Sequence, residues 1–295
     1  MDRGGRGALS AHAGPPLDRD PGMPVASPSM PVDGGLSAAV PQTAVLECRD
    51  VTKSFGGVHA VRGMSLSVPE GRIVALIGPN GAGKTTLFNC ITGLLPRDAG
   101  EIRFRGRPVT ARGLQQTAAL GIVRTFQNIR MFPGLTVYES VMAAQAARRR
   151  ASALESVLGL SRHRREWRAM NERTEEILVM LGLERHRSVI AQQLPLLAQR
   201  KIEMARALAA EPEVLLLDEP TAGATASEAQ ELMEVMRQLR DGGRTILLIE
   251  HNMRLVMNVS DLVYVMHFGS LLVSGTPAEV RADANVRSVY LGSRQ

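Results

Sequence analysis

The sequence GPNGAGKTT, residues 78–86, follows directly after the apolar run Ile73–Ile77. A continuous apolar run of this length is typical of a strand that is buried on both faces of a sheet. The pattern G-x-x-x-x-G-K-[ST] between a strand and a helix is the phosphate-binding P-loop pattern, in which backbone N–H groups surround phosphate oxygens. We therefore expect a buried strand, a loop that holds phosphate groups, and a helix whose positive end begins at about Lys84.

Each part of this loop has an expected chemical task. Its glycines let the backbone N–H groups turn inward, because no Cβ atom stands in the way. The Lys84 ammonium would neutralise the β- and γ-phosphates of a nucleotide, and the Thr85 hydroxyl would bind Mg²⁺, a hard cation that prefers oxygen ligands. The expected nucleotide-binding residues of the loop are Gly78, Pro79, Asn80, Gly81, Ala82, Gly83, Lys84, Thr85 and Thr86.

Acidic and histidine side chains follow two further apolar runs. Val214–Leu217 leads directly to Asp218 and Glu219, and Thr245–Ile249 leads to His251 with one residue between them. Because ligands bind at the carboxyl ends of the strands in open α/β sheets, we expect these side chains to lie near the P-loop. Asp218 would hold Mg²⁺ through water, Glu219 would orient or deprotonate the attacking water, and His251 would contact the γ-phosphate.

Hydrophobic patterns along the rest of the chain predict an α/β fold. Alternation predicts half-buried strands, which would form an antiparallel edge, at 45–51, 64–68 and 101–104. Residues 136–190 have mainly helical spacing of their apolar residues. Beyond Arg200, helices alternate with apolar strands, which predicts a parallel sheet covered on both faces. The elements expected there are helices at about 200–210 and 227–240 and strands near 214–217, 245–249, 262–267 and 270–274.

Composition limits the class of protein. The chain of 295 residues is 44% hydrophobic, and none of its apolar runs reaches the length of about 18 residues that crosses a bilayer. Two cysteines, Cys48 and Cys90, exclude a disulfide scaffold and a cysteine-rich zinc module. Residues 1–43 are rich in Pro and Gly, which predicts a disordered tail. The basic segment 148–187 predicts a solvated helical face or, alternatively, a surface that faces a partner or lipid headgroups.

Together these motifs resemble the ATP-binding subunits of ABC transporters, over about residues 44–292. Within that superfamily, the chain resembles the ATPases of branched-chain amino-acid-type importers, on the segments 124–132, 135–139, 248–253, 275–277 and 290–292. The resemblance implies a P-loop NTPase (RecA-like) core with an antiparallel β subdomain and an inserted α-helical subdomain. The ATPase domain would span 44–295, and the helical subdomain would span about 136–200.

The resemblance also implies cofactors, partners and further site residues. ATP and Mg²⁺ would bind, Phe55 would stack on adenine, and Gln127 would contact Mg²⁺ or water as part of the catalytic machinery. The helical subdomain would dock on transmembrane permease subunits at the cytoplasmic face of the cell membrane. A second ATPase subunit, identical or different, would pair with this one, and a solute-binding protein would act indirectly. No nucleic-acid partner is expected.

One motif departs from the family pattern. The family signature reads Leu-Ser-x-Gly-Gln, whereas this chain has LPLLAQ at residues 194–199. Pro195 and Leu197 take the places of the Ser and Gly that, in the family, contact the γ-phosphate of ATP held by the opposite subunit. The segment 224–226 is also atypical of the family's D-loop. We therefore form the hypothesis that a composite site built from this signature hydrolyses ATP poorly.

Two alternatives remain open beside an importer ATPase. A nucleotide-binding regulatory or degenerate-site subunit would fit the altered signature, although the intact Glu219 argues against it. A non-transport ABC ATPase of DNA repair or translation would need a nucleic-acid surface or tandem ATPase domains, and this chain has one P-loop. The transported solute is equally open, since branched-chain amino acids, other amino acids, amides and urea-like compounds all fit.

Overall fold

The computed structural model describes residues 44–110, 112–125, 131–146 and 161–291. All the described elements belong to one compact unit, Pro41–Gln295. The predicted tail 1–43 and Gln127 lie outside the described residues.

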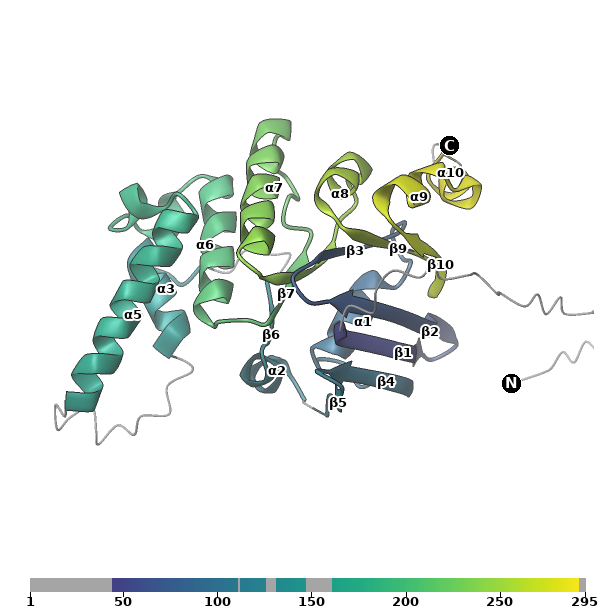
Figure 1. Ribbon diagram of the computed structural model, residues 1–295, viewed down its shortest axis with the longest axis horizontal. Coiled ribbons are helices and arrows are strands. Elements are labelled where there is room, and N and C mark those ends of the chain that lie inside the picture. Colours follow the sequence, from purple (N-terminus) through teal and green to yellow (C-terminus); the bar gives the residue numbers. More distant parts are fainter. Residues whose placement is uncertain (1–43, 111, 126–130, 147–160, 292–295) are drawn as a thin grey trace, which may run out of the picture. The chain divides into compact units, whose positions relative to one another are not determined.

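Strands of the described part form two sheets (Figure 1). The first sheet is antiparallel, with the order β2 (Val58–Pro69), β1 (Ala44–Phe55), β4 (Ala99–Phe104), β5 (Arg107–Pro108). The second sheet has the order β10 (Ser270–Gly275), β9 (Leu262–His267), β3 (Ile73–Ile77), β8 (Thr245–Ile249), β7 (Val214–Asp218), β6 (Ile122–Arg124). The antiparallel edge and the parallel sheet predicted from the sequence are both confirmed.

The second sheet is parallel except for its edge strand β10. Strands β3, β7 and β8 are buried along their whole length, as their continuous apolar runs predicted. Because the strands from β6 to β9 run in the same direction, their carboxyl ends meet at one edge of the sheet. The P-loop pattern follows β3, Asp218 ends β7 and His251 lies two residues after β8, so all three lie at this edge.

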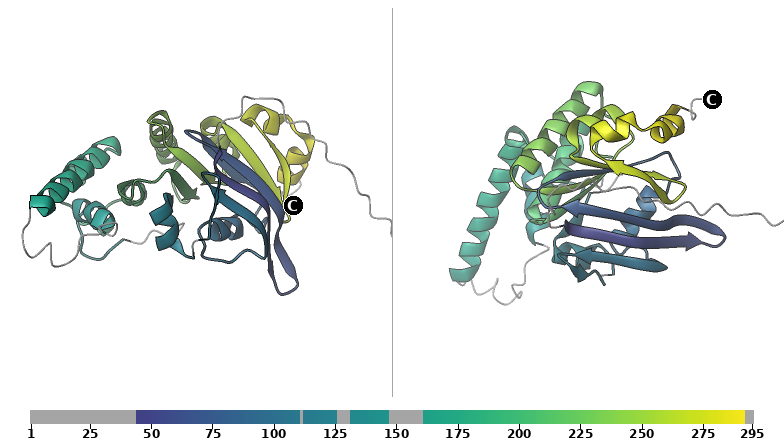
Figure 2. Two further views of the ribbon diagram at one scale, coloured as in Figure 1. Left: turned by 60° about the horizontal axis from the view of Figure 1, so that its bottom comes forward. Right: turned by 45° about the vertical axis from the view of Figure 1, so that its right-hand side comes forward.

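Two apolar clusters cover the two faces of the parallel sheet. One cluster joins a face of the sheet to α6 (Leu196–Ala209), α7 (Ala226–Asp241) and α8 (Met253–Val259). The other joins the opposite face to α1 (Lys84–Ile91) and to the antiparallel sheet, so that α1 lies in the layer between the two sheets (Figures 1 and 2). A third cluster packs α9 (Pro277–Ala282) and α10 (Ala284–Leu291) near β9 and β10.

The segment expected to be mainly helical contains α3 (Val137–Ala146), α5 (Ser161–Met180) and the short 3₁₀ turns Glu184–His186 and Ala191–Gln193. Its apolar residues Ile177, Leu178, Leu181 and Leu183 are buried in the cluster that also contains α6, which confirms the predicted helical face. Helix α6 begins at Leu196, four residues before the predicted start at about residue 200. Pro195 takes the N-cap position, and the helix does not extend to earlier residues because a proline disfavours the helical conformation in the residue before it. The short elements α2 (Leu114–Leu120) and β6 were not predicted.

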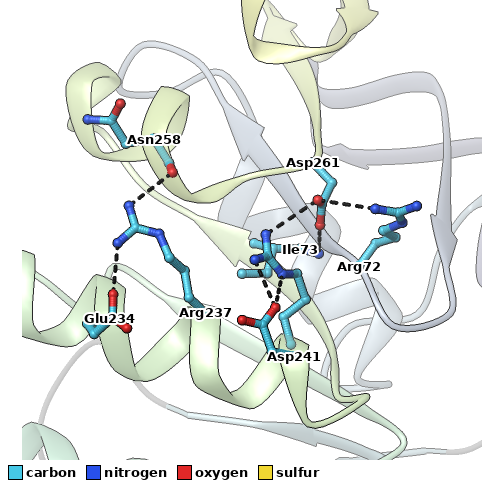
Figure 3. A network of polar contacts seen from close by, with 8 residues as sticks. Arg72, Ile73, Glu234, Arg237, Asp241, Asn258 and Asp261 are labelled. Carbon is cyan, nitrogen blue, oxygen red and sulfur yellow. Dashed lines mark hydrogen bonds and ion pairs between the residues drawn. The ribbon is translucent and has the colours of Figure 1, made fainter.

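A polar network connects α7 to the amino ends of β3 and β9, at the sheet edge opposite to the P-loop. Figure 3 shows the residues of this network. The Asp261 carboxylate accepts hydrogen bonds from the Ile73 N–H at 2.8 Å and from Arg72 at 3.4 Å. It also pairs with Arg240 of α7 at 3.5 Å. Arg237 adds a second link, because it bonds the Asn258 carbonyl at 3.1 Å. These contacts fix the layer of helices on the sheet that carries the site.

Among the described residues, none of the helices combines the length and the apolar character that crossing a bilayer requires.

Candidate functional site

The P-loop is shaped by backbone that approaches two of its glycines. At Gly78, with φ +155°, an added Cβ would overlap the carbonyl oxygen of Met266 in β9. At Gly83, with φ +102°, it would overlap the carbonyl oxygen of Ala60 in β2. Backbone cannot yield as a flexible side chain can, so only glycine fits at both positions. The loop is therefore held between the two sheets.

Lys84 is the first residue of α1, and its side chain is enclosed by the loop. The Nζ atom donates to the carbonyl oxygens of Gly78 at 2.7 Å and Pro79 at 3.0 Å. Burial lowers the pKa of Lys84, against the opposing effect of the nearby Glu219 and Asp218 carboxylates. The ammonium thus lies near two acidic groups at the start of a helix, where anions are favoured.

Glu219 follows β7 in an uncommon backbone conformation. Its φ is +49°, which lies in the left-handed region that non-glycine residues seldom adopt. The Glu219 N–H donates to the Ile249 carbonyl of β8 at 2.9 Å, which holds the turn in place. Strained backbone of this kind is concentrated at functional sites, where the surrounding structure maintains it. Here it supports the predicted role of Glu219.

The structure brings the two predicted catalytic side chains into contact. His251 Nε2 is hydrogen-bonded to Glu219 Oε1. The Glu219 side chain is 14% exposed and that of His251 is 40% exposed, so the pair lies at the surface of the edge rather than in the core. This hydrogen bond holds the imidazole and the carboxylate in one mutual orientation.

Glu250 forms hydrogen bonds to both loops that carry these two residues. The sequence did not indicate this role. Its carboxylate is buried, and Oε1 accepts from the Thr221 N–H at 3.0 Å and from the Thr221 hydroxyl at 2.6 Å. Oε2 accepts from the His251 N–H at 3.1 Å. The sequence does place this carboxylate directly after an apolar strand, which could have indicated a site residue. Its hydrogen-bond partners, however, depend on which strands are neighbours in the sheet.

Arg124 and Asn89 also belong to the site and were not predicted. Arg124 donates to Asp218 Oδ2 at 2.5 Å and to Asn89 Oδ1 at 2.6 Å. Asp218 Oδ1 is buried and has no hydrogen-bond partner among the described residues. A buried carboxylate oxygen without a partner fits a hard cation or a water that the cation holds, and the exposed Thr85 hydroxyl is a second oxygen donor. The side chains present therefore fit Mg²⁺.

Phe55 and Gln127 are the two remaining predicted site residues. Phe55 ends β1 on the antiparallel sheet and is 47% exposed, so its ring is accessible for stacking. The Lys53 ammonium lies 5.5 Å from the centroid of this ring. Gln127 falls outside the described residues, although β6 leads toward it.

Comparison with known proteins decides the family. A family profile described as "ABC transporter" matches residues 61–222, and one described as "Branched-chain amino acid ATP-binding cassette transporter" matches residues 270–294. The chain belongs to the ABC transporter family of ATP-binding cassettes. It is therefore an ATPase subunit of a transporter, and it binds nucleotide.

Individual relatives are similar to this chain over most of its length. The high-affinity branched-chain amino acid transport ATP-binding protein LivG of Salmonella typhimurium is 43% identical over 81% of this chain and 94% of its own length. The lipopolysaccharide export system ATP-binding protein LptB of Escherichia coli is 37% identical over 84% of this chain and 98% of its own length. The ADP conformation of MJ1267, an ATP-binding cassette of an ABC transporter, superposes with a TM-score of 0.74 at 31% identity, over 85% and 99% of the two chains.

The altered signature of this cassette forms the start of α6. Leu197 is partly buried and packs against the cluster beneath α6, while Leu196 is 38% exposed and lies beside Gly223. The isobutyl group at the family's glycine position is thus covered in part by the apolar cluster and in part exposed. The atypical D-loop has a role within the chain. Thr225 is the N-cap of α7 and forms a capping box with Glu228, which stabilises the start of this helix.

Proposed function

We propose that this cassette binds MgATP at the carboxyl edge of its parallel sheet, hydrolyses it with Glu219 and His251, and thereby powers import of branched-chain or other amino acids. The observation that carries the proposal is the contact between His251 and Glu219, on the same sheet edge as Lys84 and Asp218. Three strands that are distant in sequence deliver these groups to one place.

Nucleotide phosphates would bind over the loop 78–86. A triphosphate offers Lys84 a more strongly charged partner than the two carbonyl oxygens that hold it now. Thr85 and Asp218 would hold Mg²⁺ with Gln127. When bound, the cation neutralises phosphate charge. Phe55 would stack on the adenine ring.

Glu219 would accept the proton of the attacking water, or orient that water for attack on the γ-phosphate. His251 keeps the carboxylate in one orientation through their hydrogen bond, and its exposed ring would contact the γ-phosphate. Glu250 holds the two loops together while the water is positioned. The positive φ of Glu219 sets the direction in which its side chain leaves the strand.

The relatives support an amino acid as the transported solute. The name of LivG specifies branched-chain amino acid transport, and the family profile over residues 270–294 carries the same substrate class. LptB, whose name specifies lipopolysaccharide export, is less similar. The cassette would act at the cytoplasmic face of the membrane together with permease subunits, a second ATPase subunit and, indirectly, a solute-binding protein.

Permease docking is proposed for the helical subdomain, about residues 136–200, of the ATPase domain 44–295. A cavity of about 350 Å³ adjoins this subdomain where its helix α3 meets α6 and the end of β6, and Phe132, which precedes the subdomain, lines it. Phe132 is 48% exposed, and the Arg206 guanidinium stacks on its ring at 4.6 Å. An exposed aromatic ring beside an arginine is typical of a protein interface.

Uptake measured in cells tests the proposal. Cells that lack the native gene would be complemented with the wild type or Glu219→Gln and given radiolabelled leucine, other amino acids, amides or urea. We expect the wild type alone to restore uptake of an amino acid, with both proteins co-purifying with the permease. Equal uptake with Glu219→Gln would contradict hydrolysis-driven transport, and restored uptake of a different compound alone would contradict the substrate class.

A further inference from the structure

We propose that Arg124 is a positioning residue for the metal: its guanidinium fixes one oxygen of Asp218 and leaves the other for Mg²⁺ or a water that Mg²⁺ holds. The inference rests on the metal-binding role of Asp218 proposed above. It concerns a residue of the ATPase reaction that acts through Asp218 rather than by touching the nucleotide.

Arg124 is the last residue of β6, and Asp218 is the last residue of β7, its parallel neighbour. The pairing of these two strands brings the guanidinium alongside the carboxylate. Arg124 Nη2 donates to Asp218 Oδ2 at 2.5 Å. The two side chains are 5% and 3% exposed, so water screens this ion pair little.

The guanidinium is itself held by α1, the helix that begins at Lys84. Its Nη1 donates to Asn89 Oδ1 at 2.6 Å, and its Cζ lies 5.5 Å from the centroid of the Phe88 ring. Arg124 therefore joins the strand of the acidic residue to the helix of the P-loop. Planar guanidinium geometry suits this arrangement, because its donors point in fixed directions toward two acceptors at once.

The free oxygen explains why Arg124 assists the metal rather than competing with it. Asp218 Oδ1 is buried without a hydrogen-bond partner among the described residues, whereas Oδ2 is occupied by Arg124. A cation or its water can use Oδ1 while the arginine stays in place. A carboxylate that is already oriented loses no further rotational freedom when the metal binds, so its affinity for the metal is higher.

Manganese binding separates this positioning role from a purely structural one. Each purified protein would be titrated with Mn²⁺ in the presence of a non-hydrolysable ATP analogue, and free Mn²⁺ would be measured by electron paramagnetic resonance. Binding of a fluorescent ATP analogue in EDTA would report nucleotide affinity without metal. We expect Arg124→Ala to weaken Mn²⁺ binding at least about tenfold, as loss of a group that orients a metal ligand typically does. Metal-free nucleotide binding would change less than about twofold.

Asn89→Ala and Arg124→Lys keep the test decisive if Arg124→Ala does not fold. Asn89→Ala removes a partner of the guanidinium without leaving a buried charge unpaired, and we expect it to weaken Mn²⁺ binding about threefold. Arg124→Lys retains the charge but not the two-acceptor geometry, so its Mn²⁺ affinity would lie between those of Arg124→Ala and the wild type. The matched control is Arg103→Ala, which removes a partly exposed arginine paired with Glu101, and it would bind Mn²⁺ like the wild type.

Two results would overturn the inference in different ways. If Asp218→Asn loses Mn²⁺ binding while Arg124→Lys and Asn89→Ala bind Mn²⁺ as tightly as the wild type, Arg124 does not position the metal carboxylate. If Asp218→Asn itself keeps wild-type Mn²⁺ affinity, the metal role of Asp218 is wrong, and the inference fails with it.

Discussion

The carboxyl edge of the parallel sheet and the start of α6 both belong to sequence motifs of the ABC family, yet contacts within this chain constrain them very differently. At the sheet edge, Gly78 has no room for a Cβ, and the buried side chains of Asp218 and Glu250 are bonded to neighbouring elements. At the start of α6, Pro195 has no side-chain capping bond and Leu196 is exposed. Contacts inside the chain therefore fix the geometry of the motifs that we propose hold its own nucleotide. They do not require the family's Ser and Gly in the signature.

The largest effect is expected from Gly78→Ala. Its methyl group would overlap the Met266 carbonyl oxygen and displace the P-loop, so we expect no measurable binding of a fluorescent ATP analogue. Gly81→Ala is the matched control, because an added Cβ meets nothing within 4 Å there. Its φ of +79° still imposes strain of about 1–2 kcal/mol, which would weaken binding only moderately. Similar binding by the two variants would contradict the steric argument.

Glu219→Gln is expected to lower the turnover of ATP by at least about 100-fold, because an amide cannot accept the proton of the attacking water. Nucleotide affinity should stay near the wild-type value, since P-loop contacts are unchanged. Phosphate release and analogue binding would be measured in parallel, with the exposed Glu234→Gln as control. Turnover like that of the wild type would exclude Glu219 as the base.

Glu250→Ala should lower turnover about tenfold, because the Glu219 and His251 loops would no longer be fastened together. The buried N–H groups left without acceptors would also reduce the free energy of unfolding by about 1–3 kcal/mol. Glu250→Gln should lie between this variant and the wild type, because its carbonyl can still accept from Thr221. Denaturant unfolding and ATPase assays would be compared, and unchanged turnover in both variants would leave Glu250 a purely structural residue.

The smallest effect on nucleotide binding and hydrolysis is expected from Leu197→Gly. Lost packing and the glycine in the first turn of α6 would reduce the free energy of unfolding by about 1–3 kcal/mol. Nucleotide binding and the ATPase of the assembled transporter should change less than about twofold, because the side chain packs against the apolar cluster of its own chain. A large gain in ATPase activity would instead support the alternative that the altered signature makes a degenerate site.

Residues that directly follow a long apolar run could be assigned from the sequence. Asp218 ends the five-residue buried strand β7, His251 lies two residues beyond β8, and the P-loop that leads to Lys84 begins directly after β3; the parallel sheet brings these strand ends together. Arg124 and Asn89 could not be assigned, because their roles depend on the pairing of β6 with β7 and on the position of α1. Strand β6 has only three residues, too few to show a pattern.

The overlap that excludes a side chain at Gly78 also bears on when the site can form during synthesis. Strand β3 pairs with β8 and β9, both of which are made more than 150 residues after it. The Met266 carbonyl that closes around Gly78 belongs to β9. A nascent chain that ends before Leu262 thus has the complete P-loop sequence but not the strand against which the loop is folded. We therefore expect the P-loop to reach its nucleotide-binding conformation only once β9 has been made and has paired with β3.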